Sequence, residues 1–311
     1  MLKIAVIGIG NIAQKAYLPV MAQMRKNIEW HLVTRNENVR QEVSQAYGFL
    51  NMHENITALK GQGIEAAFVH NATHVHYETI KFLLNNGIHV YVDKPVSEDL
   101  EETKELLALA KEKNLLLTVG FNRRFAPMVE KLKAIPDKKM IFIQKDRVNN
   151  DEEVRFAIYD LFIHILDTAL FLLDDPIVSS HSHIVQEDGK LKRIWLNLET
   201  KNTSAIVSMN YEAGAKQEKI EVQSLAGIHR VTDLTELEIL DHAHMTVERF
   251  GDWEGTLEKR GFSPLIAQFI SGIVSGENPV SLASSEATHE LCEKIIQENH
   301  AFRVSFRCFL G

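Results

Sequence analysis

Short apolar runs alternate with amphipathic segments through the first 120 or so residues. Each apolar run is as long as a buried strand, and a segment with helical spacing follows it. Strands that alternate with helices in this way predict a parallel sheet covered by helices on both faces. The five runs are KIAVIGIG, EWHLVTRN, IEAAFVHNA, IHVYVDKP and LLLTVGFNRR.

The pattern changes after about residue 121. A strand is expected at KKMIFIQKDRV and a helix over about 155–173. Between His181 and Arg249, several runs alternate apolar and polar residues, which predicts an antiparallel sheet with one face in solvent. We therefore predict two domains, residues 1–121 and 122–311.

The last part of the chain is expected to be mostly helical. Two helices are predicted over about 256–275 and 283–299. From Phe302 to Leu310 apolar and polar residues alternate. This tail is suited to an edge strand or to burial against a partner subunit, and the sequence does not decide between them.

Composition narrows the class of protein. The net charge is −8 with a pI near 6.0 and the chain has no run of Lys or Arg, which argues against nucleic acid as a partner. No apolar stretch reaches the roughly 18 residues of a membrane span, and the N-terminus does not resemble a signal peptide. The two cysteines, Cys292 and Cys308, match no metal spacing and fit a reducing compartment. A cytoplasmic protein is the expectation.

A glycine turn follows the first predicted strand. Gly8, Gly10 and Ala13 form a G-x-G-x-x-A pattern, in which Gly8 permits the tight turn and Gly10 lets the backbone approach a pyrophosphate. The helix that starts at Asn11 and Ile12 then offers free N–H groups to the phosphates. Because the pattern opens a series of five strands, it predicts a dinucleotide site rather than an empty turn.

The end of the second strand indicates which dinucleotide binds. An acidic residue there would accept from the ribose 2′-hydroxyl of NAD, but this chain has Thr34 and Arg35. Arg35 is suited to pair with a 2′-phosphate, so NADP is favoured over NAD. The alternative is that Arg35 is a surface residue and Glu37 reads the ribose.

Polar residues also follow the next strands, at the edge where a doubly wound sheet binds ligands. Asn71 and His74 follow one strand, and His74 is suited either to touch the nicotinamide ribose or to cap a helix. Lys94 follows another, where partial desolvation would lower its pKa and let it share a proton with a substrate hydroxyl. An ordinary surface lysine before a turn proline explains Lys94 equally well.

The stretch GFNRRF follows the fifth strand. Asn122 is suited to orient a substrate or to cap a turn. Arg123 and Arg124 are suited to meet anionic groups or to pair with carboxylates of the protein.

The stretch YDLFIHILD raises a separate question, because it is apolar except for one stripe. Asp160, His164 and Asp167 stand at i, i+4 and i+7 of the expected helix. His164 is suited to take a hydroxyl proton near neutral pH, and Asp160 one turn away can orient it. A pair buried in the core is one alternative. A metal pair is another, but no third ligand is evident, so no metal is expected.

Together these motifs resemble the Gfo/Idh/MocA oxidoreductases. The resemblance rests on AVIGIGNIA, VDKP, GFNRRF and the D-x-x-x-H of YDLFIHILD, and it extends to about residue 299. GNIAQKAYLPV, AFVHNATHVHYE, GFNRRFAP and GDWEGTLEKRGF are closest to the MviM-like group. The tail from Ala301 has no counterpart in this resemblance.

The resemblance implies an N-terminal Rossmann domain with a doubly wound parallel sheet, followed by an α+β domain with a large, mostly antiparallel open sheet. It also implies reversible NAD(P)-linked oxidation of a sugar, cyclitol or related polyol. His164 would be the general base, Lys94 would hydrogen-bond the reacting oxygen and Asp160 would orient its neighbours. Asp93 stands where Glu is commoner, so it keeps the charge with a shorter reach. A homodimer or homotetramer through the large sheet is expected.

These readings define the expected site. The expected cofactor contacts are Gly8, Gly10, Asn11, Ile12, Thr34, Arg35, Asn71, His74, Asp93, Lys94 and Asn122. The expected substrate contacts are Lys94, Asn122, Arg123, Asp160 and His164. The main alternative function is a sensor or regulator of the same fold that binds NAD(P) without turnover; retention of Lys94, Asp160 and His164 argues for the enzyme. Glycosidic cleavage through a transient oxidation would need additional residues that we do not identify.

Overall fold

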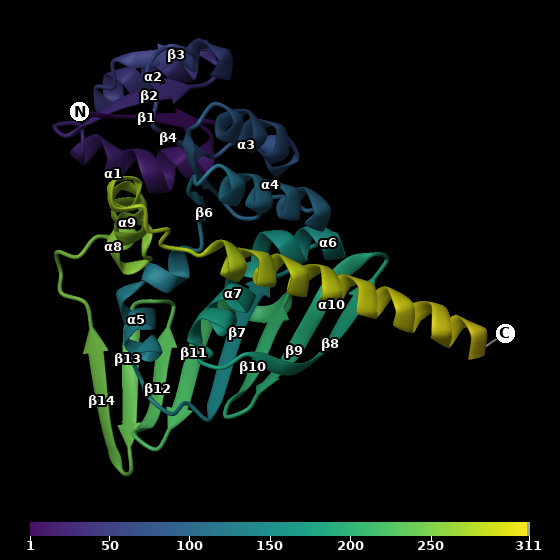
Figure 1. Ribbon diagram of the computed structural model, residues 1–311. Coiled ribbons are helices and arrows are strands. Elements are labelled where there is room, and N and C mark those ends of the chain that lie inside the picture. The colour runs from purple at the N-terminus through teal and green to yellow at the C-terminus, as the bar shows by residue number, and fades with distance from the viewer. Residues whose placement is uncertain (310–311) are drawn as a thin grey trace. The chain divides into compact units, whose positions relative to one another are not determined.

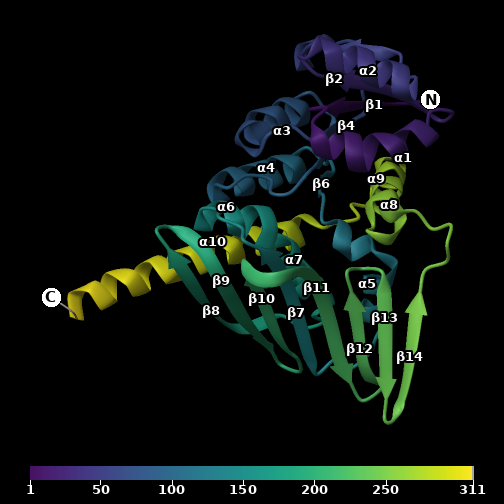
Figure 2. The same cartoon turned by 180° about the vertical axis from the view of Figure 1, so that it is seen from behind.

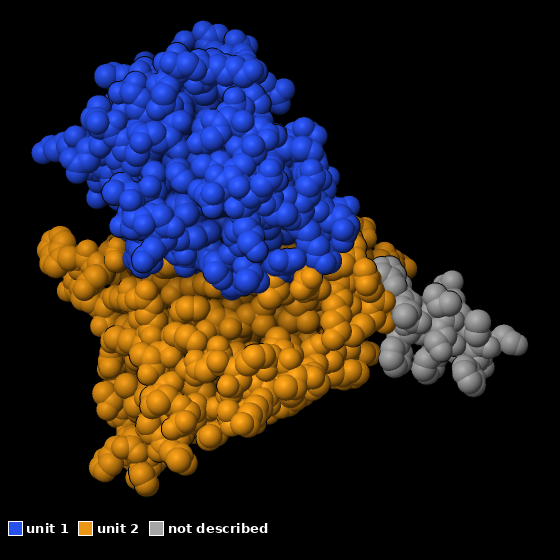
Figure 3. All heavy atoms as spheres, viewed as in Figure 1, with its two compact units in different colours: residues 1–121, 262–286 blue, residues 122–261, 287–311 orange. Residues whose placement is uncertain are grey.

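The fold is described from a computed structural model, which covers residues 1–299 with their side chains and the backbone of the last helix as far as Phe309. Contacts divide the chain into two compact units (Figure 3). Unit 1 comprises residues 1–121 and 262–286, and unit 2 comprises residues 122–261 and 287–311. The tail from Phe302 is helical as far as Phe309, so the edge strand considered for it is wrong, while the alternative of burial against a partner subunit concerns side chains outside those described.

Unit 1 contains a six-stranded parallel sheet with the strand order β3-β2-β1-β4-β5-β6 (Figure 1). This is the order of a dinucleotide-binding doubly wound sheet, as predicted. The central strands are buried on both faces, which explains why they read as continuous apolar runs. The strands are β1 (Leu2–Ile7), β2 (Ile28–Val33), β3 (Asn51–His53), β4 (Ala66–Val69), β5 (His89–Val92) and β6 (Leu117–Val119).

Helical segments cover the sheet of unit 1. A π-helical turn, Ala13–Tyr17, opens the first helix, and short 3-10 turns lie at Ile56–Leu59 and Thr73–Val75. The helices are α1 (Leu18–Gln23), α2 (Glu37–Tyr47), α3 (His76–Asn85), α4 (Leu100–Glu112) and α9 (Phe262–Ser275).

Helix α9 joins unit 1 from far along the sequence. Its Phe269 ring packs edge-on against Phe68 of β4 and Tyr91 of β5, with ring centroids 5.1 and 5.6 Å away. The domains predicted from the sequence are residues 1–121 and 122–311, so the prediction places all residues after 121 in the second domain. The structure also begins unit 2 at residue 122 but returns residues 262–286 to unit 1, because this packing is long-range.

Unit 2 contains an eight-stranded sheet with the order β14-β13-β12-β11-β7-β10-β9-β8. Only the β7–β10 pair is parallel, so the predicted large, mostly antiparallel sheet is confirmed. The strands are β7 (Met140–Val148), β8 (Ile177–Glu187), β9 (Lys190–Thr200), β10 (Ser204–Asn210), β11 (Glu212–Ser224), β12 (Gly227–Thr232), β13 (Glu236–Asp241) and β14 (His244–Arg249).

The helices α5, α7 and α10 lie on one face of this sheet (Figure 2). Alternate residues of β7 and β9 are buried beneath them, while Trp195 on the opposite face is 40% exposed. The helical segments are Asn122–Phe125, α5 (Pro127–Lys133), α6 (Val154–Ala157), the π-helical turn Ile158–Phe162, α7 (Ile163–Leu172), α8 (Thr256–Lys259) and α10 (Leu282–Phe309). Among the described helices, none is long and apolar enough to cross a membrane.

Candidate functional site

The glycine turn after β1 has the geometry that the sequence predicts. Gly8 has φ +88°, and a Cβ added there would lie 2.4 Å from the backbone nitrogen of Asn71, so no side chain fits. A Cβ added to Gly10 would meet nothing within 4 Å. The turn therefore brings β1 and the loop after β4 together at Gly8 and leaves open space at Gly10. Asn11 and Ile12 follow as exposed residues.

A cavity of about 580 Å³ opens beside this turn. That volume lies within the range of small-molecule and cofactor sites. Four of the residues predicted to contact the cofactor line it, namely Gly8, Thr34, Arg35 and Asn71. Sequence reasoning missed a further set of lining residues, Asn36, Glu54, Asn55, Ile56, Val75 and Thr79.

The end of β2 presents Arg35 to the same cavity. Arg35 is exposed, and its side chain makes no hydrogen bond or ion pair with another residue in the part of the chain described with side chains. The neighbouring side chains are committed elsewhere. Asn36 caps α2 by accepting from the backbone of Asn38 and Val39, and Arg40 donates to the carbonyl of Thr34 at 2.6 Å. Glu37, the alternative ribose reader, does not line the cavity.

These features fit a bound dinucleotide. The open space at Gly10 gives a pyrophosphate access to the backbone. The Oδ1 atom of Asn71 is buried without a hydrogen-bond partner, so an acceptor at the cavity wall is still available. Among the described residues, no group of three or more His, Cys, Asp or Glu side chains is placed to hold a metal ion.

Asp93, at the end of β5, lies in a buried hydrogen-bond network. Tyr17 donates to its Oδ1 at 2.5 Å, and the His70 Nδ1 atom lies 2.7 Å from its Oδ2. The hydroxyls of Tyr17 and Tyr91 are 2.8 Å apart. Burial raises the pKa of Asp93, but the opposing effects of His70 and Tyr17 are larger, so this pKa lies below its usual value. Asp93 is therefore held as a carboxylate by groups inside unit 1.

Lys94 follows Asp93 and is half-buried. The loop that carries it is tied to the loop after β4 through His76, whose ring nitrogens lie 2.9 Å from the carbonyl oxygens of Pro95 and Asn71. His76 is buried, whereas His74 is exposed and does not line the cavity. The network thus fixes the backbone on both sides of Lys94. Whether Asp93, His74 and Lys94 contact the cofactor stays a prediction.

In unit 2, the segment 158–172 is mostly buried. Its polar positions that stay half-exposed are Asp160 and His164, while Asp167 is 1% exposed. Asp160 lies in the π-helical turn Ile158–Phe162 and His164 in the first turn of α7. A π-helical turn inside a helix frequently marks a functional position. The stripe seen in the sequence is therefore divided into two solvent-reachable groups and one core carboxylate.

The core carboxylate Asp167 binds one arginine of the NRR stretch. Arg124 Nε and NH2 lie 2.8 and 2.5 Å from its two oxygens, and Thr288 donates to it at 3.1 Å. Burial raises the pKa of Asp167, although Arg124 opposes this shift. Arg124 and Asp167 thus connect the segment after β6 to helix α7.

The other residues of that stretch also have partners inside unit 2. Asn122 donates from its side-chain amide to the carbonyl of Arg260 at 2.7 Å. Arg123 Nε and NH2 lie 2.5 and 2.8 Å from the two oxygens of Glu218. The arginines pair with carboxylates, which was one of the two expectations. Contacts of Asn122 or Arg123 with cofactor or substrate stay predictions.

With fold and geometry established, comparison with known proteins defines the class. Residues 2–121 match the model described as "Oxidoreductase family, NAD-binding Rossmann fold", that of Gfo/Idh/MocA. Residues 127–242 match the model "YceM-like, C-terminal domain". The chain therefore belongs to the Gfo/Idh/MocA family of NAD-binding oxidoreductases.

Individual relatives agree with this assignment. The chain is 32% identical over 278 residues to the "Putative oxidoreductase YceM" of Salmonella typhimurium, which covers 86% of this chain and 88% of the relative. It is similar to a crystal structure of a dehydrogenase, MviM, from Clostridium difficile, with 33% identity and a TM-score of 0.89 over 96% of this chain and 99% of that one. A UDP-N-acetylglucosamine 3-dehydrogenase of Acidithiobacillus ferrooxidans is 27% identical over 115 residues, 35% of this chain and 36% of that one.

Proposed function

We propose that the protein transfers a hydride between NADP and a secondary alcohol of a sugar, cyclitol or related polyol. The observation that carries the proposal is the segment 158–172, a mostly buried helix in which Asp160 and His164 are the half-exposed polar positions. A carboxylate and an imidazole in that setting suit the removal of a hydroxyl proton. The relative that acts on UDP-N-acetylglucosamine supports a sugar as the substrate class.

Each residue has a distinct role in this proposal. When bound, the nicotinamide supplies the hydride acceptor or donor. His164 takes the hydroxyl proton during oxidation and returns it during reduction. Lys94 donates a hydrogen bond to the reacting oxygen and stabilises the negative charge that develops there. Asp160 orients its neighbours and favours the protonated imidazole.

The roles are tested by His164→Asn and Lys94→Met in a turnover screen of sugars and polyols. We expect kcat to fall by about 10²- to 10⁴-fold in His164→Asn, because general acid–base catalysis contributes a factor of that size. In Lys94→Met we expect a fall of about 10²- to 10³-fold, the size found when one donor to a developing oxyanion is removed. For His164→Asn, the Kd for NADPH, measured by fluorescence titration, should stay within about twofold of wild type. Lys94 is itself an expected cofactor contact, so kcat of Lys94→Met is measured at saturating NADPH. A variant that retains full turnover would exclude its residue from catalysis. Tight NADPH binding without turnover of any polyol by the wild type would instead favour a sensor.

The preference for NADP rests on Arg35, whose side chain lines the cavity and has no partner among the described residues. A guanidinium pairs with a 2′-phosphate in bidentate fashion, and such charge-assisted contacts are the strong ones. We expect Arg35→Ala to weaken NADPH binding by about tenfold or more and to leave NADH binding unchanged. Arg25→Ala is a control, because Arg25 bonds backbone carbonyls away from this cavity. Equal binding of both cofactors in wild type and variant would make Arg35 a surface residue.

A homodimer or homotetramer is part of the proposal. The exposed face of the unit 2 sheet carries large apolar side chains, among them Trp195 and Ile206, which are 40% and 37% exposed. Sedimentation equilibrium of wild type and Trp195→Glu tests this face, and an unchanged assembly in the variant would exclude it.

A further inference from the structure

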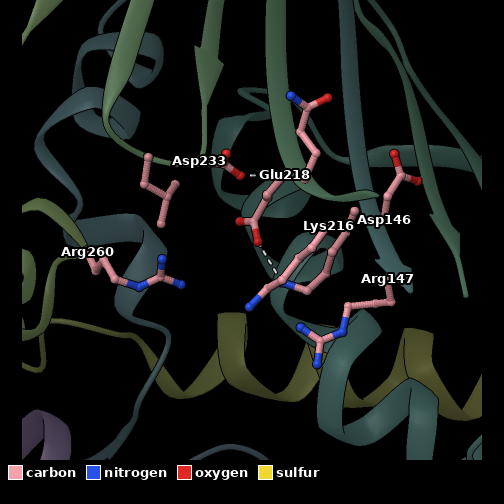
Figure 4. A pocket seen from close by; sticks show the side chains of 9 residues that line it. Asp146, Arg147, Lys216, Glu218, Asp233 and Arg260 are labelled. Atoms are coloured by element: carbon pink, nitrogen blue, oxygen red, sulfur yellow. Dashed lines mark hydrogen bonds and ion pairs between the residues drawn. The ribbon is translucent and has the colours of Figure 1, made fainter. Parts of the chain in front are cut away.

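Unit 2 contains a second cavity, of about 80 Å³, at the carboxyl end of β7 (Figure 4). Residues of β7, of β11 and of the loop after β12 line it, together with Arg260 after α8. A cavity of this volume admits a small group such as one carboxylate or one phosphate.

A buried ion cluster forms one wall of this cavity. Glu218 accepts from Arg123 through both oxygens and from Lys145 Nζ at 2.6 Å. Burial raises the pKa of Glu218, but these two cations outweigh that effect and hold it well below its usual value. The backbone N–H of Glu218 donates to Asp233 at 2.9 Å. The single carboxylate of Glu218 is therefore already shared by two cations.

Three more cations surround the cavity. Arg147, Lys216 and Arg260 line it, and none of their side chains makes a hydrogen bond or ion pair within residues 1–299. Arg260 is half-buried, and burial together with the charge of Arg123 lowers its pKa. Asp146 also lines the cavity, but alternation along β7 points its carboxylate to the opposite face, where it accepts from Gln144. Asp233 is a second carboxylate at the cavity besides Glu218, and both oppose the lowering of the Arg260 pKa. The lining cations Lys145, Arg147, Lys216 and Arg260 still outnumber these two carboxylates, so the cavity is positive.

The cavity lies on the sheet face that carries helix α7. Ile141, Ile143 and Lys145 of β7 are buried on the face against which α7 packs, and Arg147 continues the same alternation. Burial and Glu152 raise the pKa of the Tyr211 hydroxyl; Asp160 raises it further and Arg147 lowers it. Asp160 and Arg147 are therefore both near this hydroxyl, so the cavity and the proposed catalytic helix belong to one side of unit 2.

We propose that this cavity, which we call the Arg147–Lys216–Arg260 pocket, binds an anionic group of the substrate. The substrate class is then a sugar or polyol that carries a carboxylate or a phosphate. The pocket supplies guanidinium and ammonium donors whose side chains have no hydrogen-bond or ion-pair partner among the described residues. Such donors bind an anionic group more strongly than a neutral hydroxyl, so the pocket favours an anionic substrate. This inference rests on the proposed dehydrogenase function for the identity of the ligand.

The test is direct binding to NADPH-loaded protein, which does not require turnover. Calorimetric titrations compare glucuronate, galacturonate and glucose 6-phosphate with glucose and galactose. The variants are Arg260→Gln and Lys216→Gln, and the matched control is Lys201→Gln, an exposed lysine in the turn between β9 and β10. Glucuronate and galacturonate test whether the pocket binds a carboxylate, and glucose 6-phosphate tests whether it binds a phosphate.

We expect at least one anionic sugar to bind about tenfold or more tightly than its neutral counterpart. Arg260→Gln and Lys216→Gln should each weaken that binding by about tenfold, because each removes a charge-assisted contact. The Kd for NADPH and the behaviour of Lys201→Gln should not change. No preference for any anionic sugar, or an equal loss for neutral and anionic sugars, would overturn the pocket.

Turnover separates this proposal from the proposed function. Oxidation of neutral polyols with no anionic preference would overturn the pocket and leave the dehydrogenase standing. Anion binding that Arg260→Gln weakens, without turnover of any polyol, would support the pocket and contradict the dehydrogenase.

Discussion

One carboxylate of each unit, Asp93 in unit 1 and Glu218 in unit 2, lies beside residues with a proposed role, and the two are held in different ways. In unit 1, Asp93 accepts from the hydroxyl of Tyr17 and the ring of His70. In unit 2, Glu218 accepts from Arg123 and Lys145. Burial raises the pKa of both carboxyl groups, and in both the partners outweigh it, so each pKa lies below its usual value.

The difference lies in the charge that each arrangement leaves over. The donors to Asp93 are a phenol and an imidazole, so that network holds its carboxylate without a surplus of positive charge. The donors to Glu218 are two full cations that share one anion, so the surrounding region stays positive. The Asp93 network is suited to fix the loop that carries Lys94, and the Glu218 cluster is suited to bind an anion nearby. The comparison also predicts that the two networks fail differently when a partner is removed.

The largest expected effect is that of Glu218→Gln. The substitution keeps the size of the side chain but leaves Arg123 and Lys145 buried with like charges and no carboxylate between them. Breaking a buried ion pair from one side costs about 3–5 kcal/mol. We expect a loss of that size in the free energy of unfolding, measured by urea denaturation at pH 7.

Glu221→Gln on the same strand is the matched control. Glu221 accepts from Arg230, whose side chain is 43% exposed, so the loss should stay below about 1 kcal/mol. If both variants lost the same free energy, the Glu218 cluster would be no more than a surface ion pair.

Tyr17→Phe has a smaller expected effect, because it removes a neutral donor. Asp93 loses one of its two side-chain hydrogen bonds. A hydrogen bond to a charged group contributes about 1.5–3 kcal/mol to the free energy of unfolding, so we expect a loss of that size. The pKa of Asp93 is lower in the folded protein than its usual value of 3.8. The contribution of Asp93 to the free energy of unfolding is therefore fully present above pH 3.8 and is lost as the pH falls through the pKa of the folded protein. Urea denaturation of both proteins between pH 7 and pH 3 measures it.

Tyr91→Phe is the control for this network. It removes only the contact with the Tyr17 hydroxyl and should cost about 1 kcal/mol. A Tyr91→Phe loss as large as that of Tyr17→Phe would mean that the bond to Asp93 contributes nothing of its own.

Much of the fold was predictable because it depends on local patterns. The strands β1 and β4 are buried on both faces, so they appear as apolar runs. Strand β3, Asn51–His53, was not predictable in this way, because its three residues are half-buried and form no apolar run. The place of α9 depends on Phe269 packing against Phe68 and Tyr91, which lie 201 and 178 positions earlier, so no local pattern records it.

The site was predictable only where it is local. The glycine turn needs Gly8 and Gly10 within three residues, and the structure gives Gly8 the expected positive φ. The partner of Asp93, in contrast, is Tyr17, 76 residues away and at the end of a π-helical turn that helical spacing does not predict. The carboxylate that pairs with Arg123 comes from a strand 95 residues later. The sequence shows where charged residues are, but it does not show which residues will be their ion-pair or hydrogen-bond partners.

The smallest effect concerns the protonation of Lys145. Burial and the charge of Arg123 lower its pKa to about 8 from 10.5. The unfolded chain therefore binds more protons than the folded one between these values, and the contribution of Lys145 to stability rises with pH across that window. Relative to Lys145→Met, which does not titrate, wild type should gain about 1 kcal/mol in the free energy of unfolding between pH 8 and pH 9. Lys201→Met, an exposed control, should differ from wild type by a constant amount. A flat difference for Lys145→Met would mean that Glu218 balances Lys145 completely, and the cluster would then have no positive surplus to offer an anion.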